Sequence, residues 1–197
     1  MRRGFVRVIL LAAGLALLAA CGGGGGGGAD PASLVVNGSF EDPDVPSGFS
    51  VVPASEGNLR GWTFVNGNPI AIVDNLAVSG GEAWQAYQGD QFVQLDIGGN
   101  GGIFQAVATV PGARYTVSFA YKPRPDSDFD TCAVLFYLND AFMDSIPFPN
   151  ARFRAWIPYF YSFTATGTAT NVMFVAAGND DGSGGFIDDV RVVASED

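Results

Sequence analysis

The chain offers few side chains that could catalyse a reaction. It contains no histidine, the usual general base near neutral pH and the commonest transition-metal ligand in proteins. Glycoside hydrolysis needs two carboxylates across a cleft. The chain has only four glutamates, no two of which alternate along one expected strand: Glu41, Glu56, Glu82 and Glu196. It also lacks the Gly-x-Ser-x-Gly elbow of esterases, so the sequence predicts a protein that is not an enzyme.

Cys21 is the residue whose setting indicates a specific chemical modification. Three arginines among the first seven residues precede an apolar run at 8–20, which is shorter than the roughly 20 residues of a membrane-spanning helix. The run ends in Leu18-Ala19-Ala20-Cys21, which resembles the lipobox of bacterial lipoproteins, where the cysteine thiol takes a diacylglycerol. Ordinary secretory cleavage, with Cys21 left as a free thiol, is the alternative. We expect residues 1–20 to be a lipoprotein signal peptide and Cys21 to carry the lipid.

The segment after Cys21 is expected to be a tether. Residues 22–28 are seven consecutive glycines, which cannot contribute to a core, and a Gly-rich linker of this length spans about 15 Å. Residues 21–32 would therefore hold the following domain near a membrane through the N-terminal lipid. The expected location is the cell envelope, at the outer membrane or the cell surface.

Charge excludes one class of partner. The signal peptide contains three of the ten basic residues and none of the twenty acidic ones, so the mature chain carries a formal charge of −13. Binding to nucleic acid needs clustered lysines and arginines that displace counterions from phosphates. The sequence therefore predicts no nucleic-acid partner.

Hydrophobic periodicity predicts one all-β domain at residues 33–195. Apolar and polar residues alternate in short segments that are separated by Gly- and Pro-rich turns, and no segment has a helical pattern. This pattern is typical of an antiparallel two-sheet β-sandwich of the jelly-roll kind. The expected strands are 92–97, 103–109, 114–121, 134–138, 159–165, 172–176 and 186–193.

Five motifs resemble a known series when they are taken in order. They are Asn37-Gly38-Ser39-Phe40-Glu41, Gly61-Trp62, Gly102-Ile103-Phe104-Gln105, the segment 110–119, and Phe186-Ile187-Asp188-Asp189-Val190. The series resembles the galactose-binding-like jelly rolls, which include many carbohydrate-binding modules. It is most similar to the bacterial choice-of-anchor domains and their plant cell-wall relatives. The resemblance implies that this chain is anchored to the cell, and its anchor would be the lipid on Cys21.

The resemblance also implies a structural calcium ion. In the carbohydrate-binding relatives, calcium often joins the N-terminal segment to the last strand. The matching positions make Glu41 and Asp188 or Asp189 the candidate carboxylates, completed by backbone carbonyls near Asn37. Calcium prefers six to eight hard oxygen ligands, and the alternation along 186–192 places Asp188 on the core-facing register, where an unpaired carboxylate is costly. The alternative is an aspartate that caps a turn.

Aromatic side chains make up 13% of the chain and supply candidate sugar-binding residues. Five of them fall on inward registers and are expected in the core: Phe119, Tyr121, Phe136, Phe163 and Phe174. Another five are expected in loops or on the opposite register, where their faces could stack on sugar rings. These are Trp84, Tyr87, Tyr137, Trp156 and Tyr159. A role in the core or in anchoring a loop is the alternative for each of them.

The sequence as a whole predicts a surface-anchored, non-catalytic module that binds extracellular or envelope polysaccharide. The first alternative is a structural or adhesive envelope protein that binds other proteins. A weaker alternative is a polysaccharide hydrolase or lyase.

Overall fold

The computed structural model describes residues 32–55, 59–75, 77–79, 82–125, 127, 131–146 and 155–195. Every regular element within these ranges is a β-strand, and none of them contains a helix that could cross a membrane. The expected signal peptide, Cys21 and the glycine tether lie outside the described residues.

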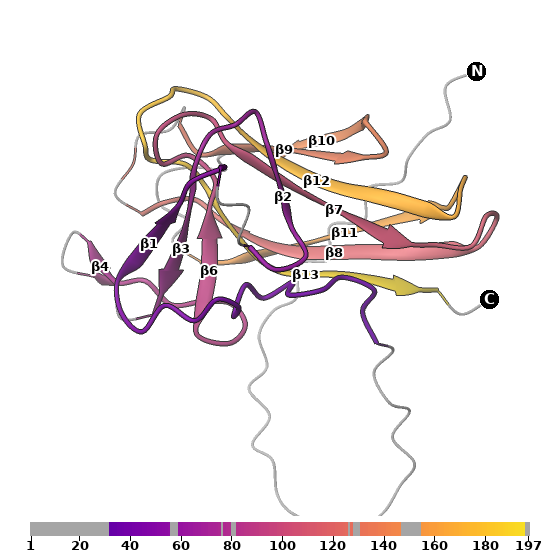
Figure 1. Cartoon of the computed structure of the whole chain (residues 1–197), viewed down its shortest axis with the longest axis horizontal. Helices are drawn as coiled ribbons and strands as arrows, with labels where there is room; N and C mark the ends of the chain where they lie inside the picture. Colours follow the sequence, from indigo (N-terminus) through magenta and orange to yellow (C-terminus); the bar gives the residue numbers. More distant parts are fainter. Residues whose placement is uncertain are drawn as a thin grey trace, which may run out of the picture.

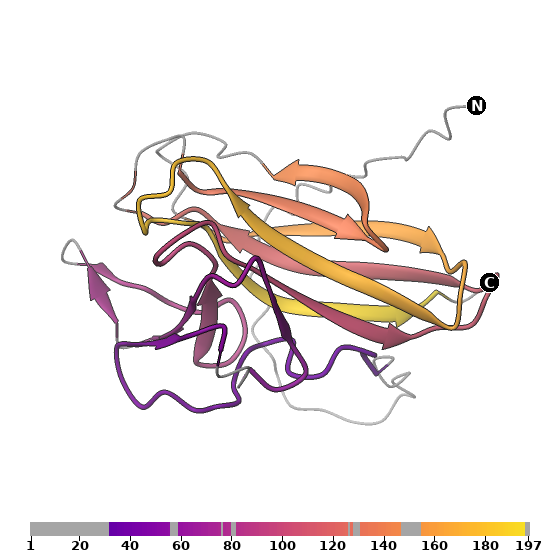
Figure 2. The ribbon, with the colours of Figure 1, turned by 45° about the horizontal axis from the view of Figure 1, so that its top comes forward.

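Two antiparallel sheets form the two layers of a β-sandwich, as the sequence predicted (Figures 1 and 2). The six-stranded sheet has the order β1 (Phe49–Val52), β3 (Ile70–Asp74), β6 (Gln91–Gln94), β13 (Phe186–Ala194), β8 (Arg114–Lys122) and β11 (Ile157–Thr164). The five-stranded sheet has the order β10 (Ala141–Ile146), β9 (Ala133–Leu138), β12 (Ala169–Ala177), β7 (Gly102–Ala108) and β2 (Thr63–Val65). A small hairpin pairs β4 (Val78–Ser79) with β5 (Glu82–Ala83).

The main core fills the space between the two sheets. Strand β8 shows the period of two, because Tyr115, Val117, Phe119 and Tyr121 are buried against the five-stranded sheet. The Phe119 ring lies 4.7 Å from the Phe174 ring of β12, between centroids. The inward positions expected from the sequence are confirmed, since four of those five aromatic residues are buried and the fifth packs partly buried on the core.

A second hydrophobic cluster covers part of the outer face of the six-stranded sheet. Strand β3 explains how it arises, because all five of its residues are buried. Ile70 and Ile72 belong to the main core, whereas Ala71 and Val73 belong to this second hydrophobic cluster together with Phe92 of β6 and Phe186 of β13. This sheet is therefore apolar on both faces around β3 and β6.

A β-bulge in β13 changes the direction of its side chains. Asp188 lies opposite Ala120 and Arg191 lies opposite Ser118, so β13 has one extra residue there. Asp189 sits in the bulge with a φ of 46°. Val190 returns to the main core, whereas Asp188 belongs to the outer face. The expected core-facing register of Asp188 is thus wrong, because the bulge separates it from the register of Val190.

The N-terminal segment pairs with the second half of β13. The Leu34 N–H donates to the Val192 carbonyl at 2.8 Å, and the Val190 N–H donates to the Gly38 carbonyl at 2.9 Å. Glycine is required at position 38 because a Cβ there would lie 2.0 Å from the Val190 oxygen. The segment therefore runs beside the bulge of β13.

Candidate functional site

Five aromatic residues gather on the outer face of the six-stranded sheet, and we call them the outer cluster: Trp84, Tyr87, Phe92, Trp156 and Phe186. Phe92 and Phe186 form its base, with ring centroids 4.7 Å apart. Trp84 packs 5.1 Å from Phe186, and Trp156 packs 5.5 Å from Phe92. Tyr87 meets Trp156 edge-on at 6.2 Å. The fold thus joins three of the five aromatic residues that the sequence proposed for sugar binding.

The members of the outer cluster differ in exposure. Tyr87 is 46% exposed and Trp156 is half-buried, whereas Trp84 is only 6% exposed. The Trp156 indole N–H donates to the Gln85 carbonyl at 2.8 Å, which fixes the ring against the loop. Tyr87 and Trp156 are therefore the rings that a ligand can reach, whereas Trp84 is buried against Phe186.

Two cations lie on the rings of the outer cluster. The Lys122 Nζ is 5.8 Å from the centroid of the Trp156 ring, and the Arg124 guanidinium is 5.1 Å from that of Trp84. Such contacts are favourable because the ring face carries negative charge. The cations bring polar groups to the border of an otherwise apolar surface.

Asp188 holds the loop that carries Tyr87. One of its carboxylate oxygens, Oδ2, accepts the N–H of Tyr87 at 2.8 Å and that of Gln88 at 3.0 Å, and Oδ1 accepts the N–H of Asp189. The side chain is fully buried. Burial raises the pKa of Asp188 to about 7, although the three hydrogen bonds act in the opposite direction and Asp189 adds to the rise.

Glu41 holds the other end of the same loop. Its Oε1 accepts the N–H groups of Asp90 and Gln91, both at 3.0 Å. Gly89 lies between these contacts with a φ of 72°, and a Cβ there would fall 2.3 Å from Oε1. Two carboxylates from opposite ends of the chain therefore fix the backbone of residues 87–91.

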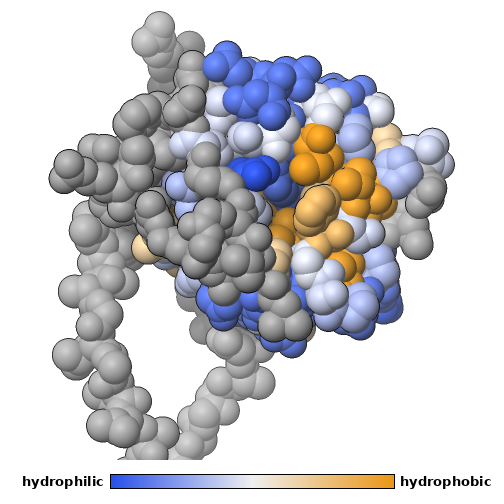
Figure 3. All heavy atoms as spheres, turned by 90° about the vertical axis from the view of Figure 1, so that its left-hand side faces the viewer, coloured by the Kyte–Doolittle hydropathy of each residue, from blue (hydrophilic) through white to orange (hydrophobic). Residues whose placement is uncertain are grey.

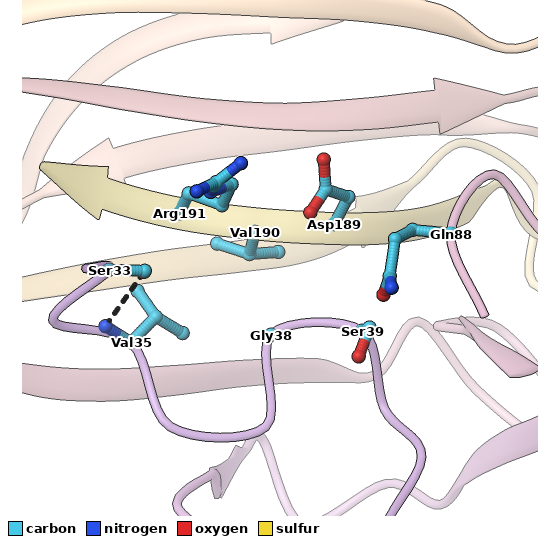
Figure 4. Close-up of a pocket in the computed structure, with 8 residues that line it drawn as sticks. All are labelled: Ser33, Val35, Gly38, Ser39, Gln88, Asp189, Val190 and Arg191. Carbon is cyan, nitrogen blue, oxygen red and sulfur yellow. Dashed lines mark hydrogen bonds between the residues drawn. The ribbon is translucent and has the colours of Figure 1, made fainter. Parts of the chain in front are cut away.

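A pocket of about 320 Å³ adjoins this loop (Figure 4). Asp189 and Arg191 stand side by side on β13, and Gln88 reaches toward Ser39 of the N-terminal segment. Burial raises the pKa of the Asp189 carboxyl, and the nearby Arg191 partly offsets this rise. The lining residues are Ser33, Val35, Gly38, Ser39, Gln88, Asp189, Val190 and Arg191.

The predicted calcium ligands make other contacts in this structure. Glu41 and Asp188 accept backbone N–H groups, as described above. The Asn37 side chain closes a turn, because its Oδ1 accepts the Asp42 N–H at 3.1 Å and its Nδ2 donates to the Asp42 carbonyl at 2.6 Å. Among the described residues, no three His, Cys, Asp or Glu side chains are grouped to hold a metal. The calcium site stays a prediction that rests on the resemblance.

The other two aromatic candidates lie away from the outer cluster. Tyr137 of β9 contacts Phe142 of β10, at 5.7 Å between centroids, in the five-stranded sheet. Tyr159 of β11 stacks on Phe119 at 5.6 Å and packs on the main core. The expectation that Tyr159 faces away from the core is wrong, because β11 pairs in register with β8 and places Tyr159 opposite Phe119.

Comparison with protein families assigns the domain to a family. The model described as "Protein of unknown function (DUF642)" matches residues 33–193. The chain belongs to the DUF642 family. The comparison with curated proteins gives no match.

Solved structures share the sandwich fold of this DUF642 chain at low sequence identity. The structure of TmCBM61 in complex with beta-1,4-galactotriose is 15% identical, with a TM-score of 0.52, and the match covers 83% of this chain and 99% of that one. A family 35 carbohydrate binding module from Clostridium thermocellum is 14% identical, with a TM-score of 0.46 and coverages of 76% and 100%. The enzymatically active domain of tailspike protein 4 from bacteriophage CBA120 is 14% identical, with a TM-score of 0.49 and coverages of 83% and 21%. At 15% identity, the likeness to TmCBM61 shows the fold alone.

Sequence reasoning missed part of the site of this DUF642 domain. Phe92 and Phe186 begin expected strands, but periodicity alone did not show that they face an outer cluster. The signal that was available is the two-sided apolar character of 70–73, where four consecutive apolar residues indicate a strand buried on both faces. Gln88 and Arg191 had no such signal, because only the bulge and the loop contacts bring them together.

Proposed function

We propose that this DUF642 domain is a non-catalytic module that binds extracellular or envelope polysaccharide through Tyr87 and Trp156, while a lipid on Cys21 anchors it to the cell envelope. The observation that carries the proposal is the exposed Tyr87 ring beside Trp156, on a loop whose next residue, Gln88, lines a polar pocket. Flat rings with polar tips suit the apolar faces and hydroxyl edges of sugars.

A fixed loop allows the Tyr87 surface to bind a ligand without first being ordered. Asp188 and Glu41 hold the backbone on both sides of Gly89, so a ligand does not have to order the loop that carries Tyr87. Ordering a binding surface costs affinity, and a preformed one avoids this cost. Many lipid-anchored copies on a repetitive polymer would add multivalency to a modest single-site affinity.

The environments of the motif carboxylates support a non-catalytic role. Glu41 and Asp188 both accept pairs of backbone N–H groups from one loop, which is a structural task.

TmCBM61, whose fold this chain shares, was solved with beta-1,4-galactotriose. Beta-1,4-galactan is for that reason the first probe.

Affinity electrophoresis in gels that contain soluble polysaccharides tests the proposal. The wild-type protein should be retarded by at least one member of a panel that includes beta-1,4-galactan, pectin, xylan and dextran. Tyr87→Ala should lose the retardation. Phe142→Ala is the matched control, because Phe142 is an aromatic residue that is 58% exposed on the other sheet. Equal retardation of both variants would contradict the site, and release of reducing sugar would favour a hydrolase.

One observation favours the adhesive alternative. Strand β1 forms an edge of the six-stranded sheet, and two of its side chains, Phe49 and Val51, are 61% and 47% exposed. Figure 3 shows apolar residues gathered on the face that lies on the β1 and β4 side of the molecule. An exposed apolar patch can bind another protein. Capture of an envelope protein that Phe49→Ser abolishes, with no retardation by any polysaccharide, would favour this function.

A further inference from the structure

We propose that the pocket next to Tyr87 is a subsite for one neutral sugar unit that protrudes from the polymer, either a chain end or a side branch. This inference rests on the proposed function and adds a ligand class to it. It assigns a role in recognition to Gln88, Asp189 and Arg191, none of which belongs to the outer cluster.

The size of the pocket fits a single ring. Its volume of about 320 Å³ is at the lower end of the range for small-molecule sites, which is about 300–1,000 Å³. The N-terminal segment forms one wall and includes Ser33. The Ser33 Oγ accepts the N–H groups of Val35 and of Val192 in β13, which holds this wall against the strand. The pocket therefore has room for about one sugar ring, which suits a unit that protrudes from the polymer.

The side chains of the pocket match the hydroxyl groups of a sugar. Each hydroxyl both donates and accepts a hydrogen bond. The Asp189 carboxylate only accepts, the Arg191 guanidinium only donates, and Gln88 and Ser39 supply both kinds of group. Because Asp189 and Arg191 carry opposite charges, their charges offset each other at the pocket, which favours a neutral sugar over a uronate.

The bulge of β13 connects the pocket with the aromatic surface. In a regular strand Asp188 and Asp189 would point to opposite faces. Here Asp188 reaches under the loop to the N–H groups of Tyr87 and Gln88, and Asp189 lines the pocket beside Arg191. Gln88 follows Tyr87 directly in the chain. A sugar in the pocket and a sugar on the Tyr87 ring can therefore be neighbours in one glycan.

Asp189→Asn tests the subsite with little change in shape. Asparagine tolerates the positive φ of position 189, so the fold should persist. Asp140→Asn is the matched control, because Asp140 has a φ of 62° in the exposed turn between β9 and β10. The probes are D-galactose, D-glucose, D-mannose, D-xylose and L-arabinose, with D-galacturonate and D-glucuronate as charged counterparts. Saturation-transfer NMR with the purified full chain detects their binding.

At least one neutral monosaccharide should bind at millimolar concentration, and more tightly than its uronate. Asp189→Asn should weaken that binding about tenfold or more, since it replaces a charged acceptor, whereas Asp140→Asn should not. All three proteins should have the same melting temperature within a few degrees. Tyr87→Ala should lose retardation by polysaccharide and keep the monosaccharide signal, because Tyr87 contributes its backbone, and not its ring, to the position of Gln88.

The outcomes separate this inference from the proposed function. A wild-type protein that is retarded by polysaccharide but binds no monosaccharide, or an Asp189→Asn variant that binds as well as the wild type, overturns the subsite and leaves the proposed function intact. A uronate that binds more tightly than its neutral counterpart overturns the assignment of a neutral sugar. If neither polymer nor monosaccharide binds, the proposed function fails and the subsite fails with it.

Discussion

Replacing Asp188 should reveal how strongly its carboxylate holds the Tyr87 loop. The side chain is fully buried and accepts the N–H groups of Tyr87, Gln88 and Asp189. Asp188→Ala removes the acceptor of these three partly buried donors, and a buried donor without a partner costs about 1–3 kcal/mol. Because water can reach some of them, the free energy of unfolding should fall by about 1–3 kcal/mol in total. Asp188→Asn keeps one acceptor oxygen and should cost less.

The same residue should make stability depend on pH. Burial raises the pKa of Asp188 from 3.8 to about 7, so between these values the folded chain binds one more proton than the unfolded chain. The stabilisation is fully present below pH 3.8 and is lost as the pH rises through 7. A difference of about three pKa units corresponds to about 4 kcal/mol. The wild type should thus become less stable from pH 5 to pH 8, and Asp188→Asn should lose most of that slope.

Urea denaturation at pH 5, 6, 7 and 8 measures both effects, with tryptophan fluorescence as the signal. Asp140→Asn, which removes one exposed carboxylate far from the loop, controls for net charge. Parallel pH profiles for the wild type and Asp188→Asn would refute the reasoning, because the titrating group would then not be this buried carboxyl. An Asp188→Ala variant as stable as the wild type would show that the three N–H groups find other partners.

Three further predictions concern the loop, the lipid and the metal. Gly89→Ala should lower stability by more than about 1 kcal/mol in urea denaturation and weaken polysaccharide retardation, because the new Cβ meets Glu41. Gly67→Ala is the control, since Gly67 has a φ of 70° and open space around it. It should cost less stability and leave retardation unchanged. Labelled fatty acid should be incorporated into the wild type and not into Cys21→Ser, and equal labelling would exclude lipidation at this residue. The resemblance to calcium-bearing modules predicts that chelation lowers the melting temperature; identical melting with and without millimolar calcium would leave Glu41 and Asp188 only their contacts with the loop.

The sequence predicted the parts of the fold that depend on local periodicity. Strand β12 alternates cleanly between buried and exposed or partly exposed residues, and β8 does so over its first six residues. Strand β8 was expected close to its observed bounds, whereas β12 is longer at both ends than the expected 172–176. Strands β2 and β10 were not expected. Strand β2 has three residues and the burial of β10 does not alternate, so neither has a clear period of two. The continuous burial of β3 depends on the outer cluster, which forms only after distant segments meet.

The candidate site was predicted in part, for reasons that particular residues make clear. Glu41 and Asp188 were expected to act together, and they do bracket one loop, but the partners of their carboxylates are backbone N–H groups. The contact between Asp188 and Tyr87 joins residues 101 positions apart, and no local pattern encodes it. The bulge at Asp189, which directs Asp188 to the outer face and Asp189 to the pocket, was equally invisible in the alternation of 186–192.

The three tryptophans allow one direct measurement of where polysaccharide binds. The indole N–H of Trp62 donates to the Asn37 carbonyl at 3.0 Å, and that of Trp156 donates to the Gln85 carbonyl at 2.8 Å. The Trp84 indole N–H is buried and has no hydrogen-bond partner among the described residues. Each indole gives its own NMR signal. Titration with a polysaccharide that retards the wild type should shift the Trp156 signal most, shift that of Trp84 less, and leave that of Trp62 unchanged. A shift of the Trp62 signal with Trp156 unmoved would contradict binding at the outer cluster.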